Sequence, residues 1–215
     1  MIKLCLIALL LPGAGAFAAP KKQLTSAPVK VTTKTDDALL REHRARLSEI
    51  SGIKKMSGPG GVAALKPLLS DRNPLVRGEA AEAMGKTKDP AAFAELSADV
   101  KSADSNIRWG AVKGLGDFGD QKAVPLLISA LGHPERNTRW KAAQALGELK
   151  DARAVDALTA AARSDKDKHV RLAAIEAMLN IGGAKAAAAA EGLRNDPDPE
   201  IKAWAAAAAE KLKLK

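Results

Sequence analysis

The amino-acid sequence predicts an all-α fold, a right-handed α-solenoid (an α-α superhelix), and the main reason is a repeated sequence motif. The motif consists of a β-branched residue, a basic residue and, three positions after the basic one, an alanine. Its basic members are Arg77, Arg108, Arg139, Arg171 and Lys202, so the steps are 31, 31, 32 and 31 residues. A period in this range is typical of solenoids, in which each repeat buries its apolar face only against its neighbours.

The composition also favours helices that pack closely. Hydrophobic residues make up 47% of the chain, yet aromatic residues only 3%, and there is no tyrosine. Much of the apolar content is alanine, which combines the best helix propensity with a small side chain. No run alternates Val, Ile, Thr and aromatic residues as a strand would. The class predicted is therefore all-α.

Five repeats account for residues 58–215, and each is expected to contain two helices, A and B. Their predicted ranges are 58–88, 89–119, 120–150, 151–182 and 183–215. Asp and Asn are preferred N-caps because their side chains accept hydrogen bonds from the first turn of a helix. The expected caps are Asp89, Asp120 and Asp151 for A helices, and Asn73, Asp104, Asp167 and Asp198 for B helices, with Glu135 a weaker match. Glycines at the ends of B helices, Gly85, Gly116 and Gly147, are expected to close them in a left-handed conformation, and Gly182-Gly183 to close the fourth.

The N-terminal segment reads as a cleavable signal peptide over residues 1–18. Lys3 precedes the apolar run Leu4–Leu11, and Ala16-Phe17-Ala18 is an A-x-A cleavage site. Cleavage after Ala18 predicts a periplasmic or secreted protein with no transmembrane span. The one cysteine, Cys5, would be removed, which leaves no thiol for a disulfide or a metal.

A flexible basic linker is expected over 19–35, and an N-terminal capping helix with a hinge over 36–57. Residues 19–56 contain nine Lys or Arg against four Asp or Glu, while residues 57–215 contain 24 against 21. The formal charge of +9 is thus concentrated ahead of the repeats. A nucleic-acid-binding groove would be expected to show the reverse, so the distribution argues against nucleic acid as the partner.

The repeat pattern resembles a known family. Asp151-Ala152-Arg153-Ala154-Val155 through Asp167 to Val170-Arg171, and the segment from Asp120 to Gly147, are similar to HEAT-like repeats of the phycobilisome-lyase type. The resemblance implies an α-solenoid over 58–215. It also implies that each arginine pairs with a turn aspartate six residues earlier. Those positions hold Asp71, Asp165 and Asp196, but Ser102 and His133 in repeats two and three.

The same two repeats hold tryptophans directly after the basic residue, at Trp109 and Trp140. Equivalent positions on adjacent helices place the indoles about 10 Å apart, and tryptophan is enriched at binding hot spots. A recognition patch for a protein or peptide partner is one interpretation. Packing into space left by Gly110 and Gly114 is the alternative. The candidate partner-binding residues are Trp109, Trp140, Lys113, Lys141, Gln144, Arg108 and Arg139.

No catalytic, metal-binding or cofactor-binding constellation is recognisable. The three histidines lack a partner at helical spacing for a metal, and no G-x-S-x-G or phosphate-binding glycine motif is present. The sequence therefore predicts a non-catalytic scaffold or adaptor that binds through the B helices. A bilin lyase or isomerase, suggested by the resemblance, and a polyanion-binding module remain as alternatives.

Overall fold

The computed structural model describes residues 34–53 and 59–213 of the chain. The predicted signal peptide (1–18) and all but the last two residues of the predicted linker (19–35) lie outside the described residues. The chain divides into two units, 1–40 and 41–215. Helix α2 (Lys34–Ile53) begins in the first unit and ends in the second. All regular elements of the described residues are helical.

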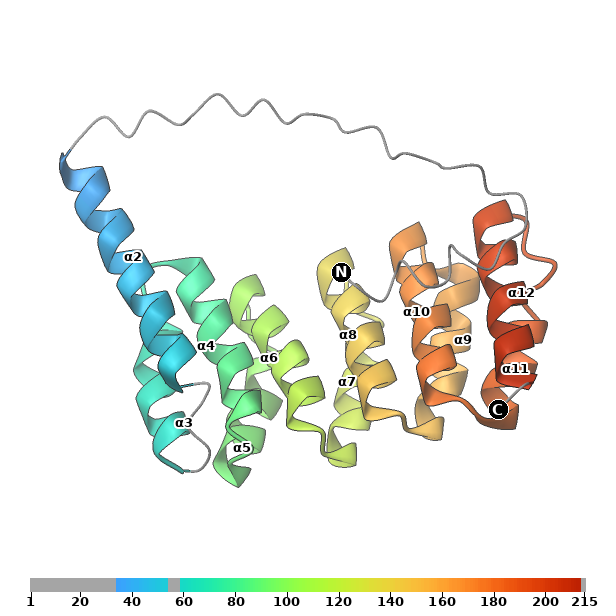
Figure 1. The fold of residues 1–215 in the computed structure, drawn as a ribbon, viewed down its shortest axis with the longest axis horizontal. Coiled ribbons are helices and arrows are strands. Elements are labelled where there is room, and N and C mark those ends of the chain that lie inside the picture. The colour runs from blue at the N-terminus through green and yellow to red at the C-terminus, as the bar shows by residue number, and fades with distance from the viewer. Residues whose placement is uncertain (1–33, 54–58, 214–215) are drawn as a thin grey trace. The chain divides into compact units, whose positions relative to one another are not determined.

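The second unit contains five successive helix pairs (Figure 1). The first member of each pair is called an A helix and the second a B helix. The A helices are α3 (Pro59–Leu65) with the 3-10 turn η1 (Lys66–Ser70), α5 (Pro90–Asp99), α7 (Val124–Ala130) after η2 (Gln121–Ala123), α9 (Val155–Ser164) after η3 (Ala152–Ala154), and α11 (Gly183–Glu191). The B helices are α4 (Pro74–Lys86), α6 (Ser105–Phe118), α8 (Arg136–Leu149), α10 (Lys168–Ile181) and α12 (Pro199–Lys213).

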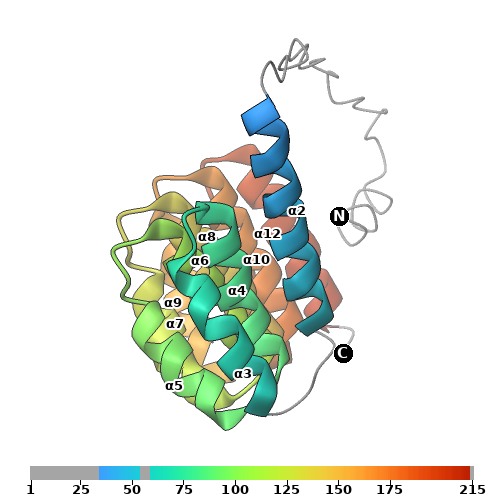
Figure 2. The same cartoon turned by 90° about the vertical axis from the view of Figure 1, so that its left-hand side faces the viewer.

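The helices of this unit form two layers, and the core lies between them. Consecutive B helices pack against one another from α4 through α12, and Figure 2 shows the A helices α3, α5, α7 and α9 as a second layer beside them. Large side chains from both layers are fully buried, among them Leu96 of α5, Leu115 of α6 and Leu146 of α8. Each pair therefore buries its apolar stripe against its partner and its neighbours, as the period predicted.

The predicted N-caps are confirmed except for Glu135, because each of the others accepts a hydrogen bond from the first turn of the helix that it begins. Asp89, Asp120 and Asp151 each accept a bond from the backbone N–H two residues later. Asn73, Asp104, Asp167 and Asp198 do the same at the B helices. Glu135 makes no such bond at α8. The alternation of helices is therefore encoded by short-range contacts that the sequence displays directly.

The expected role of three glycines is wrong. Gly85, Gly116 and Gly147 lie inside their B helices, and the left-handed residues beyond them are Lys88 (φ 55°), Gly119 (φ 78°) and Lys150 (φ 54°). The reason for glycine is instead the neighbouring helix. A Cβ at Gly85 would lie 2.0 Å from the carbonyl oxygen of Gly114. The glycines allow B helices to approach closely. Gly182 and Gly183 do have positive φ and end α10, as predicted.

The part of α2 that belongs to the second unit is joined to the first repeat. Ile50 and Ile53 are buried. Arg46 lies 3.7 Å from Asp71, and Glu42 forms an ion pair with Arg72. These contacts reach the turn between η1 and α4 and agree with the predicted capping helix. None of the described helices is both long and apolar enough to cross a membrane.

Candidate binding site on the B helices

The repeated arginines link each repeat to the next. Arg77, Arg139 and Arg171 each donate from Nη1 to the backbone carbonyl six residues earlier, over 2.8–3.0 Å, and Arg108 donates to Ser102 in the same way. Each guanidinium also contacts a carboxylate of the following repeat. The pairs are Arg77–Asp104, Arg108–Glu135, Arg139–Asp165 and Arg171–Asp198.

This geometry corrects the pairing that the family resemblance implied. The arginine takes the carbonyl at position −6, not the carboxylate. The side chain there instead accepts a bond from the backbone N–H two residues later: Asp71 from Asn73 over 2.7 Å, Ser102 from Asp104 over 3.2 Å, and His133 Nδ1 from Glu135 over 3.1 Å. Ser102 and His133 thus make the same turn contact as aspartate, and Arg108 and Arg139 keep their bonds to the backbone carbonyls there.

Arg108 and Arg139 therefore hold adjacent repeats together, and we no longer count them among the candidate partner-binding residues. They are only 6% and 5% exposed. Glu135 forms an ion pair with Arg108 instead of capping α8. The hydrogen bond from Arg108 is the main cause that lowers the pKa of Glu135. Two of the seven candidate residues are explained by the connection between repeats.

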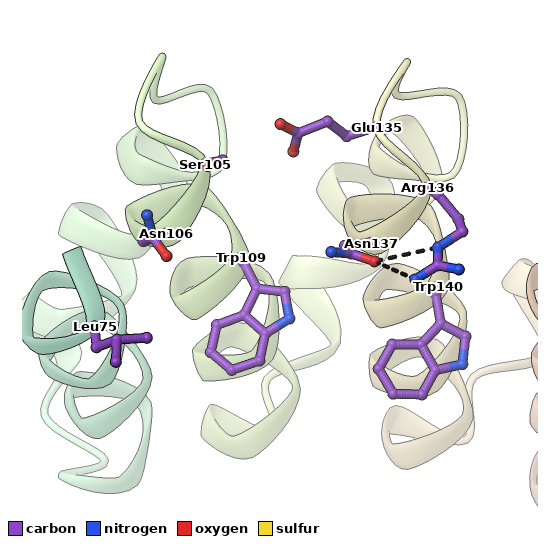
Figure 3. A pocket seen from close by; sticks show the side chains of 8 residues that line it. All are labelled: Leu75, Ser105, Asn106, Trp109, Glu135, Arg136, Asn137 and Trp140. Carbon is purple, nitrogen blue, oxygen red and sulfur yellow. Dashed lines mark hydrogen bonds between the residues drawn. The ribbon is translucent and has the colours of Figure 1, made fainter. Parts of the chain in front are cut away.

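Trp109 and Trp140 lie on the walls of one cleft, which we call the tryptophan cleft (Figure 3). Its volume is about 600 Å³. Both tryptophans are half-buried, and Figure 3 shows their rings on neighbouring helices with similar orientations. The lining comprises Leu75, Ser105, Asn106, Trp109, Glu135, Arg136, Asn137 and Trp140. A smaller hollow of about 250 Å³ adjoins it at Arg136, Asn137, Trp140 and His169.

The alternative interpretation, in which the indoles fill space left by Gly110 and Gly114, does not match the contacts. A Cβ at Gly110 would lie 2.2 Å from the carbonyl oxygen of Gly78, and one at Gly114 would lie 2.9 Å from that of Ala81. Both glycines thus face α4, and the backbone of α4 fills the space beside them. The indoles are left to line the cleft between α6 and α8.

Lys141 joins the two tryptophans. Its ammonium lies 5.1 Å from the ring centroid of Trp109 and 4.5 Å from that of Trp140, within the range of cation–π attraction. Burial and then the charge of Lys113 lower the pKa of Lys141, against the opposing effect of nearby carboxylates. Within the described part of the chain, Lys141 forms no ion pair with a carboxylate.

The remaining candidates differ in their surroundings. Lys113 lies 3.0 Å from Asp117 and 3.7 Å from Glu82, and Lys86 shares both carboxylates at 3.7 and 2.7 Å. These four side chains form a balanced network between α4 and α6. Gln144 is half-buried on α8, one turn after Lys141. Lys113 therefore forms ion pairs within the protein, whereas Lys141 forms none among the described residues.

The sequence reasoning missed the six lining residues other than the tryptophans. Three of them, Leu75, Asn106 and Asn137, occupy equivalent positions. Each occupies the second position of its B helix, three residues before Gly78, Trp109 and Trp140 respectively. Side chains three residues apart share a helix face, so the tryptophans could have identified them. Leu75 is 59% exposed, an unusual environment for a large apolar side chain in this protein.

No group of three or more His, Cys, Asp or Glu side chains that could hold a metal ion occurs among residues 34–53 and 59–213. His133 lies in the turn before α8, and His169 lies in the first turn of α10. At and beside the tryptophan cleft, the described residues bring together aromatic, apolar and cationic side chains. Such a surface is suited to binding a partner.

The helix pairs and the linking arginines define the chain as an α-solenoid built from helical repeats. A family model of HEAT repeats matches residues 37–99 and 96–178, so the chain belongs to the HEAT-repeat family.

Comparisons with solved structures agree with this fold. A chain of the complex of CpcE and CpcF of phycocyanin lyase from Nostoc sp. PCC7120 is 28% identical with a TM-score of 0.57, over 72% of this chain. The match spans 65% of that chain, less than two thirds of its length. An engineered protein (22% identity, TM-score 0.56, covering 86% and 93% of the two chains) and a designed armadillo repeat protein in complex with the peptide (KR)4 (19%, 0.56, 80% and 94%) share the fold. No curated protein sequence matches the chain significantly.

Proposed function

We propose that this chain is an exported, non-catalytic HEAT-repeat scaffold that binds a protein partner through its B helices, with an extended peptide segment of the partner in the tryptophan cleft. The observation that carries the proposal is the placement of Trp109 and Trp140. A chain with three tryptophans in 215 residues puts two at equivalent positions of adjacent repeats, where they line one cleft.

The cleft suits an extended chain. Adjacent B helices repeat about every 10 Å, and an extended peptide advances about 3.3 Å per residue. A segment of about three residues therefore spans one helix spacing, with side chains able to reach both indoles. Asn106 and Asn137 add carboxamides at equivalent positions, which can donate to and accept from peptide groups. A designed armadillo repeat protein with this fold forms a complex with the peptide (KR)4, which supports peptide binding by such a solenoid.

The test replaces both Trp109 and Trp140 by alanine and measures partner binding. Hot-spot tryptophans are worth about 2 kcal/mol or more each. Loss of one should therefore lower partner affinity about thirtyfold, and loss of both about a thousandfold. The partner is first captured from the native envelope fraction and purified, and the dissociation constant is then measured by calorimetry.

Trp204→Ala is the matched control, because Trp204 is also half-buried on a B helix, α12, but does not line the cleft. It should leave affinity unchanged. Circular dichroism and urea denaturation confirm that the double variant is folded. Full affinity in a folded double variant contradicts the proposal.

Export is supported by the pattern Ala16-Phe17-Ala18 after the apolar run Leu4–Leu11. We expect the protein in the periplasmic or extracellular fraction, with Ala19 as its first residue. Cell fractionation and intact mass spectrometry check this. A cytosolic protein that retains residues 1–18 contradicts it.

A bilin lyase or isomerase is the second candidate, favoured by the similarity to the phycocyanin lyase chain. Mixing the protein with free bilin tests it. An absorbance shift that survives a chase with unrelated protein supports the lyase class and weakens the scaffold proposal. An unchanged absorbance spectrum contradicts the bilin lyase or isomerase candidate.

A further inference from the structure

Among the described residues, the basic side chains beside the tryptophan cleft are paired with carboxylates, but Lys141 is not. Arg108 pairs with Glu135, and Lys113 with Asp117. The exposed Arg136 lies 3.8 Å from Asp167. Lys141 is half-buried, so its ammonium is partly removed from water, yet it forms no ion pair among the described residues. Cations in such environments are usually paired.

The two indoles compensate Lys141 only in part. A cation–π contact attracts the ammonium to the ring faces, but it leaves the positive charge uncancelled. The indole faces are also taken by this ammonium. A partner's lysine or arginine that approached them would meet a like charge at short range, which is unfavourable. A carboxylate of the partner would instead be attracted by the ammonium of Lys141.

From this arrangement we propose that the tryptophan cleft selects an acidic extended peptide segment, with a glutamate or aspartate carboxylate of the partner paired to Lys141 and its methylene groups against Trp109 and Trp140. The proposal rests on the proposed function and names the chemistry of the partner. The uncapped first turn of α8, whose N-cap Glu135 is turned to Arg108, adds positive potential at the same cleft.

A single unpaired cation favours a peptide over a nucleic acid. Nucleic-acid binding neutralises several phosphates at once and therefore needs several free cations. The neighbouring lysines, Lys86 and Lys113, are already engaged with Glu82 and Asp117. Lys141, whose ammonium lies beside the two indoles of the tryptophan cleft, thus offers one site for one carboxylate. The carboxylate that the cleft itself contains, Glu135, is already paired with Arg108.

The test uses three synthetic peptides, each about eight residues long, that alternate threonine with glutamate, glutamine or lysine. Binding is followed by NMR through the indole N–H signals of a uniformly 15N-labelled protein. Trp109 and Trp140 report on the cleft, and Trp204 on α12 is the internal control. We expect the Glu-Thr peptide to shift the two cleft signals and to bind at least about tenfold more tightly than the Gln-Thr and Lys-Thr peptides.

Lys141→Met keeps an unbranched side chain on the indoles and removes the charge. It should weaken the Glu-Thr peptide at least about tenfold and leave the Gln-Thr peptide unchanged. The control Lys202→Met removes an exposed basic residue of α12 and should change neither, which separates a local ion pair from net charge.

The outcomes are distinguishable. If the Trp109→Ala/Trp140→Ala variant loses its natural partner but Lys141→Met binds the Glu-Thr peptide as wild type does, the acidic selectivity is wrong and the scaffold proposal stands. If the double tryptophan variant keeps its partner, the proposed function itself fails. Tighter binding of a single-stranded oligothymidine than of the Glu-Thr peptide at physiological salt overturns the inference in favour of nucleic acid.

Discussion

Replacing Gly85 by alanine should destabilise the protein by about 3 kcal/mol or more. The new Cβ would lie 2.0 Å from the carbonyl oxygen of Gly114 and 2.6 Å from its Cα, so the obstacle is backbone and cannot rotate away. Overpacking of a tight interface typically costs about 1–3 kcal/mol, and more where the backbone must move. Helices α4 and α6 would have to separate. Urea denaturation followed by circular dichroism measures the loss.

Two glycine controls calibrate this effect. Gly52→Ala in α2 meets nothing within 4 Å, and alanine has the higher helix propensity, so it should gain up to about 1 kcal/mol. A Cβ at Gly147 would meet Ala177 at 2.8 Å, a milder overlap, so Gly147→Ala should lie between the two. A Gly85→Ala protein as stable as wild type would show that α4 and α6 do not approach as closely as described.

These glycines also show where sequence reasoning reaches its limit. Both a left-handed closing residue and a close helix contact place glycine near the end of a B helix, so position alone does not separate them. The helices continue to Lys86, Phe118 and Leu149, beyond the glycines. Deciding between the two roles requires the neighbouring helix, which lies about one repeat away in the sequence.

The parts that sequence did predict depend on contacts within a few residues. The caps are bonds from a side chain to the backbone two residues later, as at Asp89 and Asp104. The arginine partners lie 26 or 27 residues ahead, in the next repeat, and this was missed. The tryptophan pair was found because the period itself places Trp109 beside Trp140, but the period does not reveal the cleft or the unpaired Lys141.

The second large effect is expected at the connection between the third and fourth repeats. Arg139→Met should cost about 3 kcal/mol, the lower end for breaking a buried ion pair. The side chains of Arg139 and Asp165 are each 6% exposed and joined by two hydrogen bonds of 2.7 and 2.9 Å. The substitution also removes the donor to the carbonyls of His133 and Pro134. Urea denaturation at neutral pH gives the magnitude.

Arg77→Met is the control, since Arg77 and Asp104 form the ion pair between the first and second repeats with 21% and 26% exposure. Asp104 is the N-cap of α6, whereas Asp165 lies two residues before the N-cap of α10. Greater contact with water reduces the penalty, so a loss of about 1 kcal/mol is expected. Equal losses for the two variants would mean that burial does not set the strength of these connections.

The dependence of the Arg139→Met effect on pH tests the same pair independently. Burial acts to raise the pKa of Asp165, but hydrogen bonds from Arg139 and from the backbone N–H of Asp167 outweigh it, so this pKa lies below its ordinary value. A carboxyl whose pKa is lower in the folded state stabilises the fold above its unfolded pKa, about 3.9, and loses this contribution as the pH falls through the folded value. The difference in unfolding free energy between wild type and Arg139→Met should therefore be full near pH 7 and shrink below about pH 4. A difference that stays constant into acid would assign the loss to packing instead of to the ion pair.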